Sequence, residues 1–354
     1  MFAPLAFSPD GKWLATISSG QVLLVPLPGN SEFEARTFSD IEAAQIAMVM
    51  EFDPTGRFLL LVGWSDSVGI VPVDGRPPST LEGLAGNSVT VAVAGSPSGN
   101  LVASAPSRQG PWKLKIWNLE TGERRLLDLP ESTSSSKMGR AGAVMFLAFT
   151  DESTLYSSGD GGVRRWDLAS GSHELVLASQ PESLTRMQLA ADGRTAVVGD
   201  QLLEEAAKPR TDLLKLLDLA TGQVRELTAF GEGSSSFVLD GSGTLVATSD
   251  EDGIIRVGRV SAEAPHLLLG HQGAVFSLAI SPDGHWLASK GEDNTLRLWP
   301  MPDLDKPPLH TLPHDDLIAK LQSLTNLRAV RDPESSTGWS IEIGPFPGWK
   351  EVPE

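Results

Sequence analysis

The stretch from Gly270 to Trp299, GHQGAVFSLAISPDGHWLASKGEDNTLRLW, decides the fold of this chain. Two apolar runs, Ala274–Ile280 and Trp286–Ser289, are separated by the turn residues Ser-Pro-Asp-Gly at 281–284. A tight acidic turn then leads into an alternating segment that ends at Trp299. Short apolar or alternating runs separated by tight turns are typical of antiparallel strands. The stretch therefore predicts three consecutive strands of one small sheet.

The central turn of this stretch recurs along the chain in more or less degenerate form. The last residues of the seven turns are Gly11, Gly56, Gly99, Ser153, Gly193, Gly243 and Gly284. Their spacings are 45, 43, 54, 40, 50 and 41 residues. A period of about 40–45 residues with four strands in each unit is the pattern of a β-propeller. The sequence thus predicts an all-β chain that forms a seven-bladed β-propeller.

The two ends of the repeats predict how the ring closes. The chain begins on an inner strand, Pro4–Ser8, and the last unit is followed by Pro308–Leu312, which has the character of an outer strand. We expect Pro308–Leu312 to pair beside Gln21–Leu27 and to close the ring, because closure removes exposed sheet edges. The propeller is therefore expected to span residues 1–312.

Residues 313–354 are expected to form a helix and a hairpin that pack against the propeller. The segment from His314 to Thr325 has leucine and isoleucine at helical spacing, with Asp315 and Asp316 in the first turn, where the helix dipole favours carboxylates. Two further apolar segments, at 328–330 and 339–343, predict the hairpin.

The order Gly-His, Ser-Pro-Asp-Gly, Asp and Trp in the opening stretch closely resembles a WD40-type repeat, and the resemblance extends over residues 3–312. It implies that His271, Ser289, Asp293 and Trp299 form the structural tetrad of that family, in which hydrogen bonds run from Asp through His and Ser to the Trp indole. A buried carboxylate needs donors and a buried indole N–H needs an acceptor. In the fourth blade Ser158, Asp160 and Trp166 match as a partial tetrad. The C-terminal tail resembles those of bacterial WD-repeat proteins, some of them fused to signalling domains.

Composition narrows the classes of function. The formal net charge is −17, so the electrostatic field of the chain repels nucleic acid. The chain has no cysteine, which excludes disulfides and thiolate metal sites. The sequence shows no secretory signal and no apolar run of about 18 residues, which a membrane span needs. We therefore expect a cytoplasmic protein that binds neither nucleic acid nor membrane.

No motif in the sequence predicts catalysis, a cofactor or a metal. His271, Ser289 and Asp293 could be taken for a catalytic triad, but the resemblance gives them a structural role. The segment at 95–99 has proline where a nucleophile elbow needs serine, and the acidic turn at 250–253 lacks the spacing of a calcium loop. The histidines form no zinc-binding pattern.

Long loops predict a surface for a protein or peptide partner. Insertions at 105–111, 131–142 and 199–211 belong to neighbouring blades and are expected to share one rim sector. We expect basic side chains of this sector, together with inner residues of the propeller, to bind the partner: Arg108, Lys137, Arg140, Lys208, Arg210, Met48, Met50, Met145, Phe276 and Glu292.

The sequence therefore predicts a monomeric, non-catalytic scaffold for protein–protein interaction. Two alternatives stay open. The chain could be the sensor or regulatory module of a larger bacterial signalling protein, such as a kinase or a nucleotide-switch ATPase. It could instead be a propeller hydrolase or lactonase with a metal in the central channel.

Overall fold

The computed structural model describes most of the chain. The described residues are 4–27, 34–39, 41, 47–84, 89–108, 112–130, 143–179, 183–202, 213–231, 236–324, 327–332 and 339–343.

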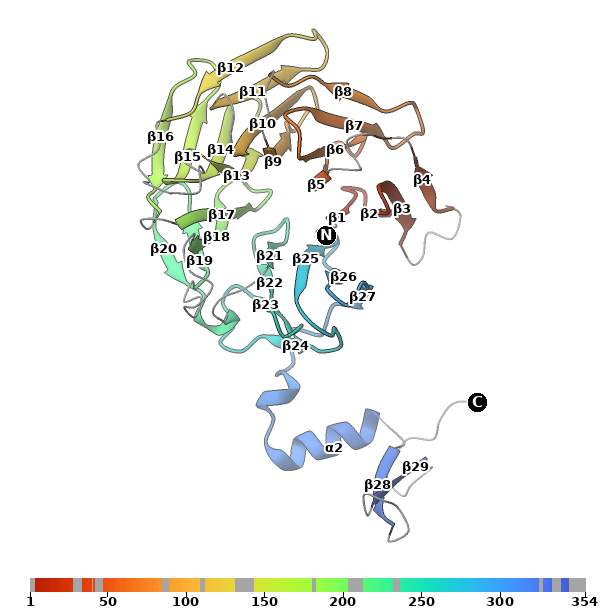
Figure 1. The fold of residues 1–354 in the computed structure, drawn as a ribbon. Coiled ribbons are helices and arrows are strands. Elements are labelled where there is room, and N and C mark those ends of the chain that lie inside the picture. Colours follow the sequence, from red (N-terminus) through yellow and green to blue (C-terminus); the bar gives the residue numbers. More distant parts are fainter. Residues whose placement is uncertain are drawn as a thin grey trace. The chain divides into compact units, whose positions relative to one another are not determined.

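Seven antiparallel sheets follow one another around a ring, so the chain is a seven-bladed propeller as the sequence predicts (Figure 1). The strands of blades one to three are β1 (Leu5–Phe7), β2 (Trp13–Ser18), β3 (Gln21–Pro26), β4 (Arg36–Phe38), β5 (Ala47–Phe52), β6 (Phe58–Gly63), β7 (Val68–Pro72), β8 (Ser79–Leu81), β9 (Val89–Gly95), β10 (Leu101–Arg108), β11 (Lys113–Asn118) and β12 (Arg124–Asp128). Those of blades four and five are β13 (Val144–Phe149), β14 (Thr154–Gly159), β15 (Gly162–Asp167), β16 (His173–Leu177), β17 (Ser183–Leu189), β18 (Thr195–Leu202), β19 (Lys215–Asp218) and β20 (Val224–Glu226), followed by the 3-10 turn η1 (Thr228–Phe230). Those of blades six and seven are β21 (Ser236–Leu239), β22 (Leu245–Ser249), β23 (Ile255–Arg259), β24 (His266–Leu268), β25 (Val275–Ile280), β26 (Trp286–Gly291) and β27 (Leu296–Pro300).

The recurring turn joins the first and second strands of each blade, and its chemistry is local. In blade seven the hydroxyl of Ser281 accepts the N–H of Trp286 at 2.9 Å and donates to the carboxylate of Asp283. Gly284 has φ +70°, a conformation that favours glycine, and its N–H donates to the carbonyl of Ser281 at 2.9 Å. The Ser-Pro-Asp-Gly sequence therefore encodes the turn within a few residues.

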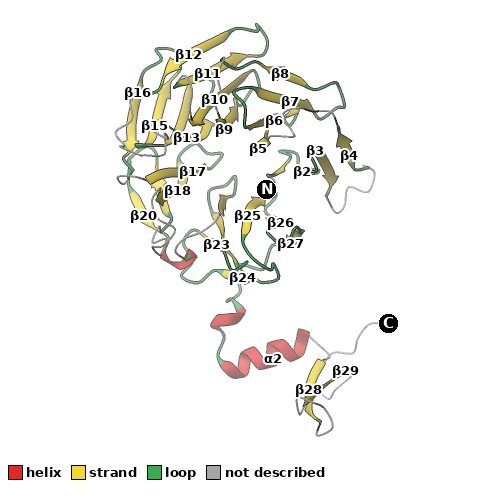
Figure 2. Cartoon of the chain, in the orientation of Figure 1, coloured by secondary structure: helices red, strands yellow, loops and turns green. Residues whose placement is uncertain are grey.

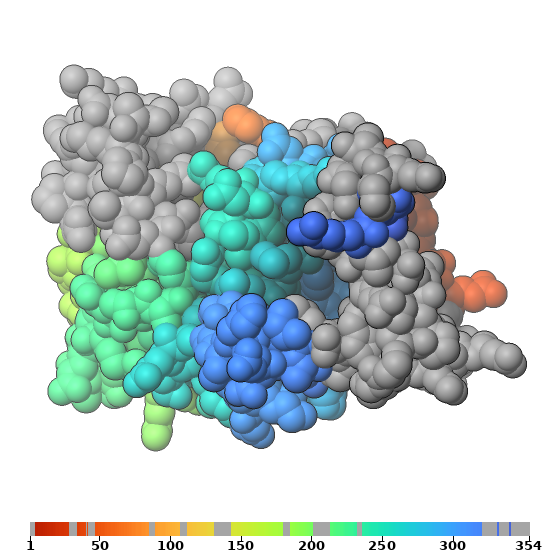
Figure 3. Space-filling model, turned by 90° about the horizontal axis from the view of Figure 1, so that it is seen from below, coloured from red at the N-terminus to blue at the C-terminus, as the bar shows by residue number. Residues whose placement is uncertain are grey.

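The core is divided among the interfaces between blades. A cluster of buried apolar side chains lies between each pair of neighbouring blades, and the cluster between blades three and four, which includes Leu147, Leu155 and Trp166, is the largest of them. The smallest closes the ring between blades one and seven and contains Leu5, Leu14, Leu27, Ala279 and Ala288. In Figure 3 the green to cyan residues of blades five and six form a continuous outer wall.

The predicted closing strand is wrong. Blade one has its own fourth strand, β4, which pairs with β3. The segment from Pro308 to Leu312 contains the 3-10 turn η2 (Leu309–Thr311) and pairs with no described strand. Pro307 and Pro308 explain the difference, because proline has no N–H to donate to a strand neighbour and fixes φ. Among the described residues, blade seven consequently has three strands and each of the other six blades has four.

A second compact unit, Asp303–Glu354, follows the propeller unit Met1–Pro302. It contains η2, the helix α2 (His314–Leu324), and the antiparallel hairpin of β28 (Leu327–Arg331) and β29 (Trp339–Ile343), as Figure 2 shows. Asp315 and Asp316 occupy the first turn of α2, as the helix dipole favours.

Candidate functional site

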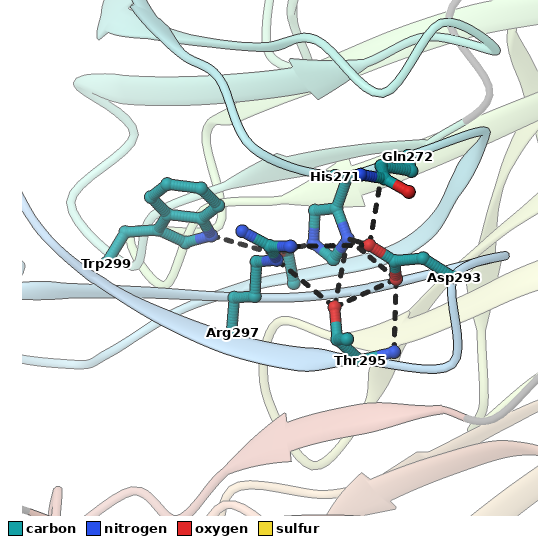
Figure 4. Close-up of polar contacts among 7 residues, drawn as sticks. His271, Gln272, Asp293, Thr295, Arg297 and Trp299 are labelled. Atoms are coloured by element: carbon teal, nitrogen blue, oxygen red, sulfur yellow. Dashed lines mark hydrogen bonds and ion pairs between the residues drawn. The ribbon is translucent and has the colours of Figure 1, made fainter. Parts of the chain in front are cut away.

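Blade seven brings four polar side chains together from different elements (Figure 4). His271 lies between β24 and β25, and Ser289 lies in β26. Asp293 occupies the turn between β26 and β27, and Trp299 lies in β27. These are the four residues that the resemblance assigns to a tetrad.

A continuous chain of hydrogen bonds joins these side chains. The indole N–H of Trp299 donates to Ser289 Oγ at 2.8 Å, and the Ser289 hydroxyl lies 2.7 Å from His271 Nε2. His271 Nδ1 is 3.0 Å from both oxygens of the Asp293 carboxylate. An indole only donates and a carboxylate only accepts, so all contacts are satisfied when a neutral imidazole accepts at Nε2 and donates at Nδ1.

The carboxylate that ends this chain has several donors. Desolvation by itself would raise the pKa of Asp293, but the N–H and hydroxyl of Thr295, the N–H of Gln272 and the ring of His271 all donate to it. Hydrogen bonds to the charged form hold the pKa of Asp293 below its usual range. Asp293 is therefore a fixed anion to which the turn and the imidazole are anchored.

His271, Ser289 and Asp293 have the connectivity of a catalytic triad, but burial argues for a structural role. The side chain of Ser289 is fully buried, and His271 is 7% exposed. Ser289 Oγ also accepts the indole N–H of Trp299, so its lone pairs point into the blade. A nucleophile needs a face that its substrate can reach.

Blade four contains a shorter version of this chain, with a different serine from the predicted one. The indole N–H of Trp166 donates to Ser157 Oγ at 2.9 Å, whereas the buried hydroxyl of Ser158 has no hydrogen-bond partner. Trp166 pairs with Leu155 across the strands, and Trp299 pairs with Leu287. In both blades the serine that accepts the indole N–H lies two residues after that leucine. Because neighbouring residues of a strand point to opposite faces, Ser158 cannot take this role. Asp160 interacts with Arg164.

A buried ion pair connects blades two and three and was not predicted from the sequence. Lys115 of β11, 1% exposed, forms an ion pair with Asp66, 6% exposed, in the turn between β6 and β7. The hydroxyl of Thr90 and the N–H of Leu84 also donate to Asp66, at 3.5 and 2.5 Å. Burial lowers the pKa of Lys115, and the contact with Asp66 opposes this shift. The sign of this ion pair in the sequence is a lysine at an inward-facing position of the third strand of a blade.

One face of the propeller, called here the top face, is where the first strand of each blade begins. Met48, Met145 and Phe276 occupy bulges at the starts of β5, β13 and β25, where the strand register shifts by one residue. All three side chains are half-buried. A bulge changes the direction of the extra side chain, so these three side chains do not follow the strand's regular alternation between its two faces.

Further apolar side chains lie at the top face. Trp64, 60% exposed, directly follows Gly63, the strand partner of Ala47, and so lies next to the bulge at Met48. Leu269, 65% exposed, follows the last residue of β24 and precedes the first strand of blade seven. The exposed Glu292 belongs to the turn after β26. Trp64 was not predicted from the sequence, where its sign is an aromatic residue in a tight turn.

Two expectations for the partner surface need correction. Met50 is 4% exposed and packs in the core between blades one and two, so it cannot contact a partner. Arg108 is the last residue of β10 and pairs with Val89, so the insertion at 105–111 begins as strand instead of loop. Lys137, Arg140, Lys208 and Arg210 lie outside the described residues.

The described part of the chain contains no group of three or more His, Asp or Glu residues that could hold a metal ion. None of its helices is long and apolar enough to cross a membrane.

Comparison with known proteins agrees with this geometry. The model of the WD domain, G-beta repeat, matches residues 263–300, which include blade seven. The nuclear distribution protein nudF of Aspergillus niger is 26% identical over 170 residues, 44% of this chain and 38% of nudF. The protein tipD of Dictyostelium discoideum is 23% identical over 258 residues, 71% of this chain and 35% of tipD. The denticleless protein homolog of Danio rerio is 30% identical over 173 residues, 44% of this chain and 26% of that protein.

The seven-bladed ring defines the fold as a β-propeller, and its seventh blade matches a WD40 repeat. The chain spans 38% or less of the length of these three relatives.

Proposed function

We propose that the protein is a non-catalytic scaffold that presents the top face of its propeller to a protein or peptide partner. The observation that carries this proposal is Trp64, which is 60% exposed beside the bulge at Met48. Tryptophan is enriched among the residues that dominate binding energy in protein interfaces. Trp64 belongs to neither of the apolar clusters beside blade two, so binding explains its place better than folding does.

The chemistry of the top face also favours a protein partner. Half-buried Met48, Met145 and Phe276 offer apolar contact area, and methionine adapts its shape to different ligands. The exposed carboxylate of Glu292 adds a negative charge to a chain of net charge −17, which favours a partner segment with basic residues. One relative is named for nuclear distribution, and this chain spans 38% of that protein.

The test compares two variants that each remove one exposed apolar side chain. Trp64→Ala changes the top face, and Leu175→Ala changes β16, the fourth strand of blade four, where Leu175 is 52% exposed. Each tagged protein is used to capture partners from a lysate of its own organism, and the partner found is then titrated by calorimetry. We expect Trp64→Ala to weaken binding about thirtyfold, the equivalent of the 2 kcal/mol that marks a hot spot. Leu175→Ala should leave the affinity unchanged.

Equal affinities of the wild type and a correctly folded Trp64→Ala variant for the partner would show that Trp64 and the top face around it do not bind it. A Leu175→Ala variant that lost binding while Trp64→Ala retained it would move the interface to the outer rim. The basic rim sector stays a separate part of the proposal, tested by charge reversal at Arg108, Arg140 and Arg210 together.

A further inference from the structure

One layer of the propeller contains the last residue of the first strand of each blade. In every blade the residue after it donates its backbone N–H to the second strand, as Ser8 does to Trp13 and Ser281 does to Trp286, so the seven strands can be aligned. The residues at the aligned position are Phe7, Phe52, Gly95, Phe149, Leu189, Leu239 and Ile280. Six of them are large and apolar, and blade three alone has glycine.

The six large side chains each cover an interface with the preceding blade. Phe52 belongs to the apolar cluster between blades one and two, and Leu239 belongs to that between blades five and six. The other four pack against the clusters of four further interfaces. The cluster between blades two and three has no such member, because Gly95 has no side chain. This interface therefore lacks the apolar cover that the other six have.

The side chain left uncovered at this interface carries a carboxyl group. Glu51 of β5 lies two residues after Val49 and pairs with Leu60, and both of these residues pack between blades two and three. Residues two apart on a strand face the same side, so Glu51 faces blade three. Four of the other blades have alanine at the position of Glu51: Ala6, Ala94, Ala148 and Ala279. An acid and a glycine therefore replace a small and a large apolar residue at this one interface.

The carboxyl of Glu51 has no hydrogen bond or ion pair with the described residues. The charged groups of the surrounding elements are paired elsewhere: Asp53 with the backbone of its own turn and with Arg57, and Asp66 with Lys115. Burial therefore acts unopposed and raises the pKa of Glu51 to about 8. A buried carboxylate is stable only when a cation or hydrogen-bond donors compensate its charge.

This carboxyl can be reached from the centre of the ring. β5 and β9 are first strands, which lie nearest the ring centre, and Glu51 is half-buried (Figure 1). Ser96 donates its N–H to Leu101 in β10, so the backbone N–H and C=O of the preceding Gly95 turn away from β10. A Cβ at Gly95 would lie 3.0–3.4 Å from Pro54 and Asp53, so this part of β9 lies against the segment that follows Glu51. The carbonyl of Gly95 is therefore a further acceptor at the same interface.

We infer that Glu51 and the edge of β9 at Gly95 form a binding site for a primary ammonium group, carried by a small amine or by a lysine side chain of a partner. An ammonium has three N–H donors and no acceptor, which matches a carboxylate beside a backbone carbonyl. Val49 and Val93 of the same interface suit its apolar stem. A metal ion fits less well, because the described residues offer no group of three His, Asp or Glu side chains. The site lies toward the end of β5, away from Met48, and does not depend on the function proposed for Trp64.

The probe is n-butylammonium, titrated into the full chain and followed by saturation-transfer NMR. Its binding must displace the proton of Glu51, so the affinity should rise about tenfold from pH 6 to pH 7, while the amine itself stays charged. K⁺ and tetramethylammonium at equal ionic strength control for charge alone and should not compete with the probe. Nα-acetyl-lysine amide distinguishes the two sources: tighter binding than that of n-butylammonium would assign the site to a partner's lysine, and weaker binding would assign it to a free amine.

Protein variants test the same site from the other side. Glu51→Gln removes the charge with little change of shape, and should weaken n-butylammonium binding about tenfold or more and abolish its pH dependence. The double variant Glu51→Gln/Gln188→Glu moves the acid to the equivalent position of blade five, at an interface that Leu239 covers. It should bind no better than Glu51→Gln alone. Trp64→Ala should bind the amine normally, which separates this site from the top face.

Four results would overturn the inference. They are a wild type that does not bind n-butylammonium at pH 7, an affinity that is the same at pH 6 and pH 7, equal binding by Glu51→Gln, and competition by K⁺ or tetramethylammonium. The last result would reduce the site to general attraction of cations by the charge of the chain. The measurements at two pH values use the wild type, so the test holds even if a variant fails to fold.

Discussion

Removal of the Ser289 hydroxyl is the most direct test of the hydrogen-bond chain in blade seven. In Ser289→Ala the indole N–H of Trp299 loses its acceptor, and Nε2 of His271 loses its donor. Ser289 is fully buried, so water cannot easily replace the lost contacts. Each orphaned buried polar group costs about 1–3 kcal/mol, so the loss of two partners should lower the free energy of unfolding by about 2–6 kcal/mol.

Blade four supplies two matched controls for the same substitution. In Ser157→Ala only the indole of Trp166 loses a partner, which predicts a loss of about 1–3 kcal/mol. In Ser158→Ala the removed hydroxyl is buried and has no partner, so the free energy of unfolding should stay the same or rise slightly. The three substitutions remove the same atom from buried second strands and differ in the number of hydrogen bonds lost.

The assay is urea denaturation followed by far-UV circular dichroism, with the unfolding temperature as a second measurement. The expected order of stability is Ser158→Ala, then Ser157→Ala, then Ser289→Ala. If Ser289→Ala matched the wild type, the hydrogen-bond chain would not stabilise the blade. If Ser158→Ala were as damaging as Ser157→Ala, the assignment of the indole acceptor in blade four would be wrong.

Three further predictions concern other buried polar groups. Asp66→Asn leaves the ammonium of Lys115 buried without a counter-charge and should lower the free energy of unfolding by about 3–5 kcal/mol. The double variant Asp66→Asn/Lys115→Met should recover much of this loss in urea denaturation. A double variant no more stable than the single one would contradict the reasoning. Burial raises the pKa of Glu51 to about 8, so the folded state holds a proton that the unfolded state releases near pH 4.5. The free energy of unfolding should therefore fall as pH rises from about 5 to 8, by at most about 1.4 kcal/mol per pH unit. Glu51→Gln should flatten this slope, which denaturation at pH 5.5 and 7.5 would reveal. His271→Ala and Asp293→Ala should each lower the unfolding temperature by several degrees, since each breaks the chain that includes Ser289, and an unchanged temperature in both would argue against a structural tetrad.

The sequence by itself determined the number of blades and the strand order within them. The turns that mark the blades are encoded by adjacent residues: Ser281 and Asp283 bond to the backbone of their own turn, and Gly284 adopts its positive φ. Such chemistry acts over a few residues, so it can be read without knowledge of distant contacts. The spacing of tetrad residues in blade seven could be recognised for the same reason, because the repeat places them within one sheet.

Only the tertiary structure decided which residues face which neighbour. Ser157 and Ser158 are adjacent and chemically identical, and the register of β14 against β15 alone gives the indole of Trp166 to Ser157. Met50 joins the core while Met48 sits at a bulge, a difference that comes from one shift in strand pairing. The pair of Asp66 and Lys115 joins two blades across 49 positions of sequence.

The predicted closing strand failed for the same reason. Whether an apolar segment becomes a fourth strand depends on the partner edge that it finds in space, and Pro307 and Pro308 turn the predicted candidate into a 3-10 turn. Local turn chemistry therefore specified the blades, and long-range strand pairing decided which polar groups are satisfied.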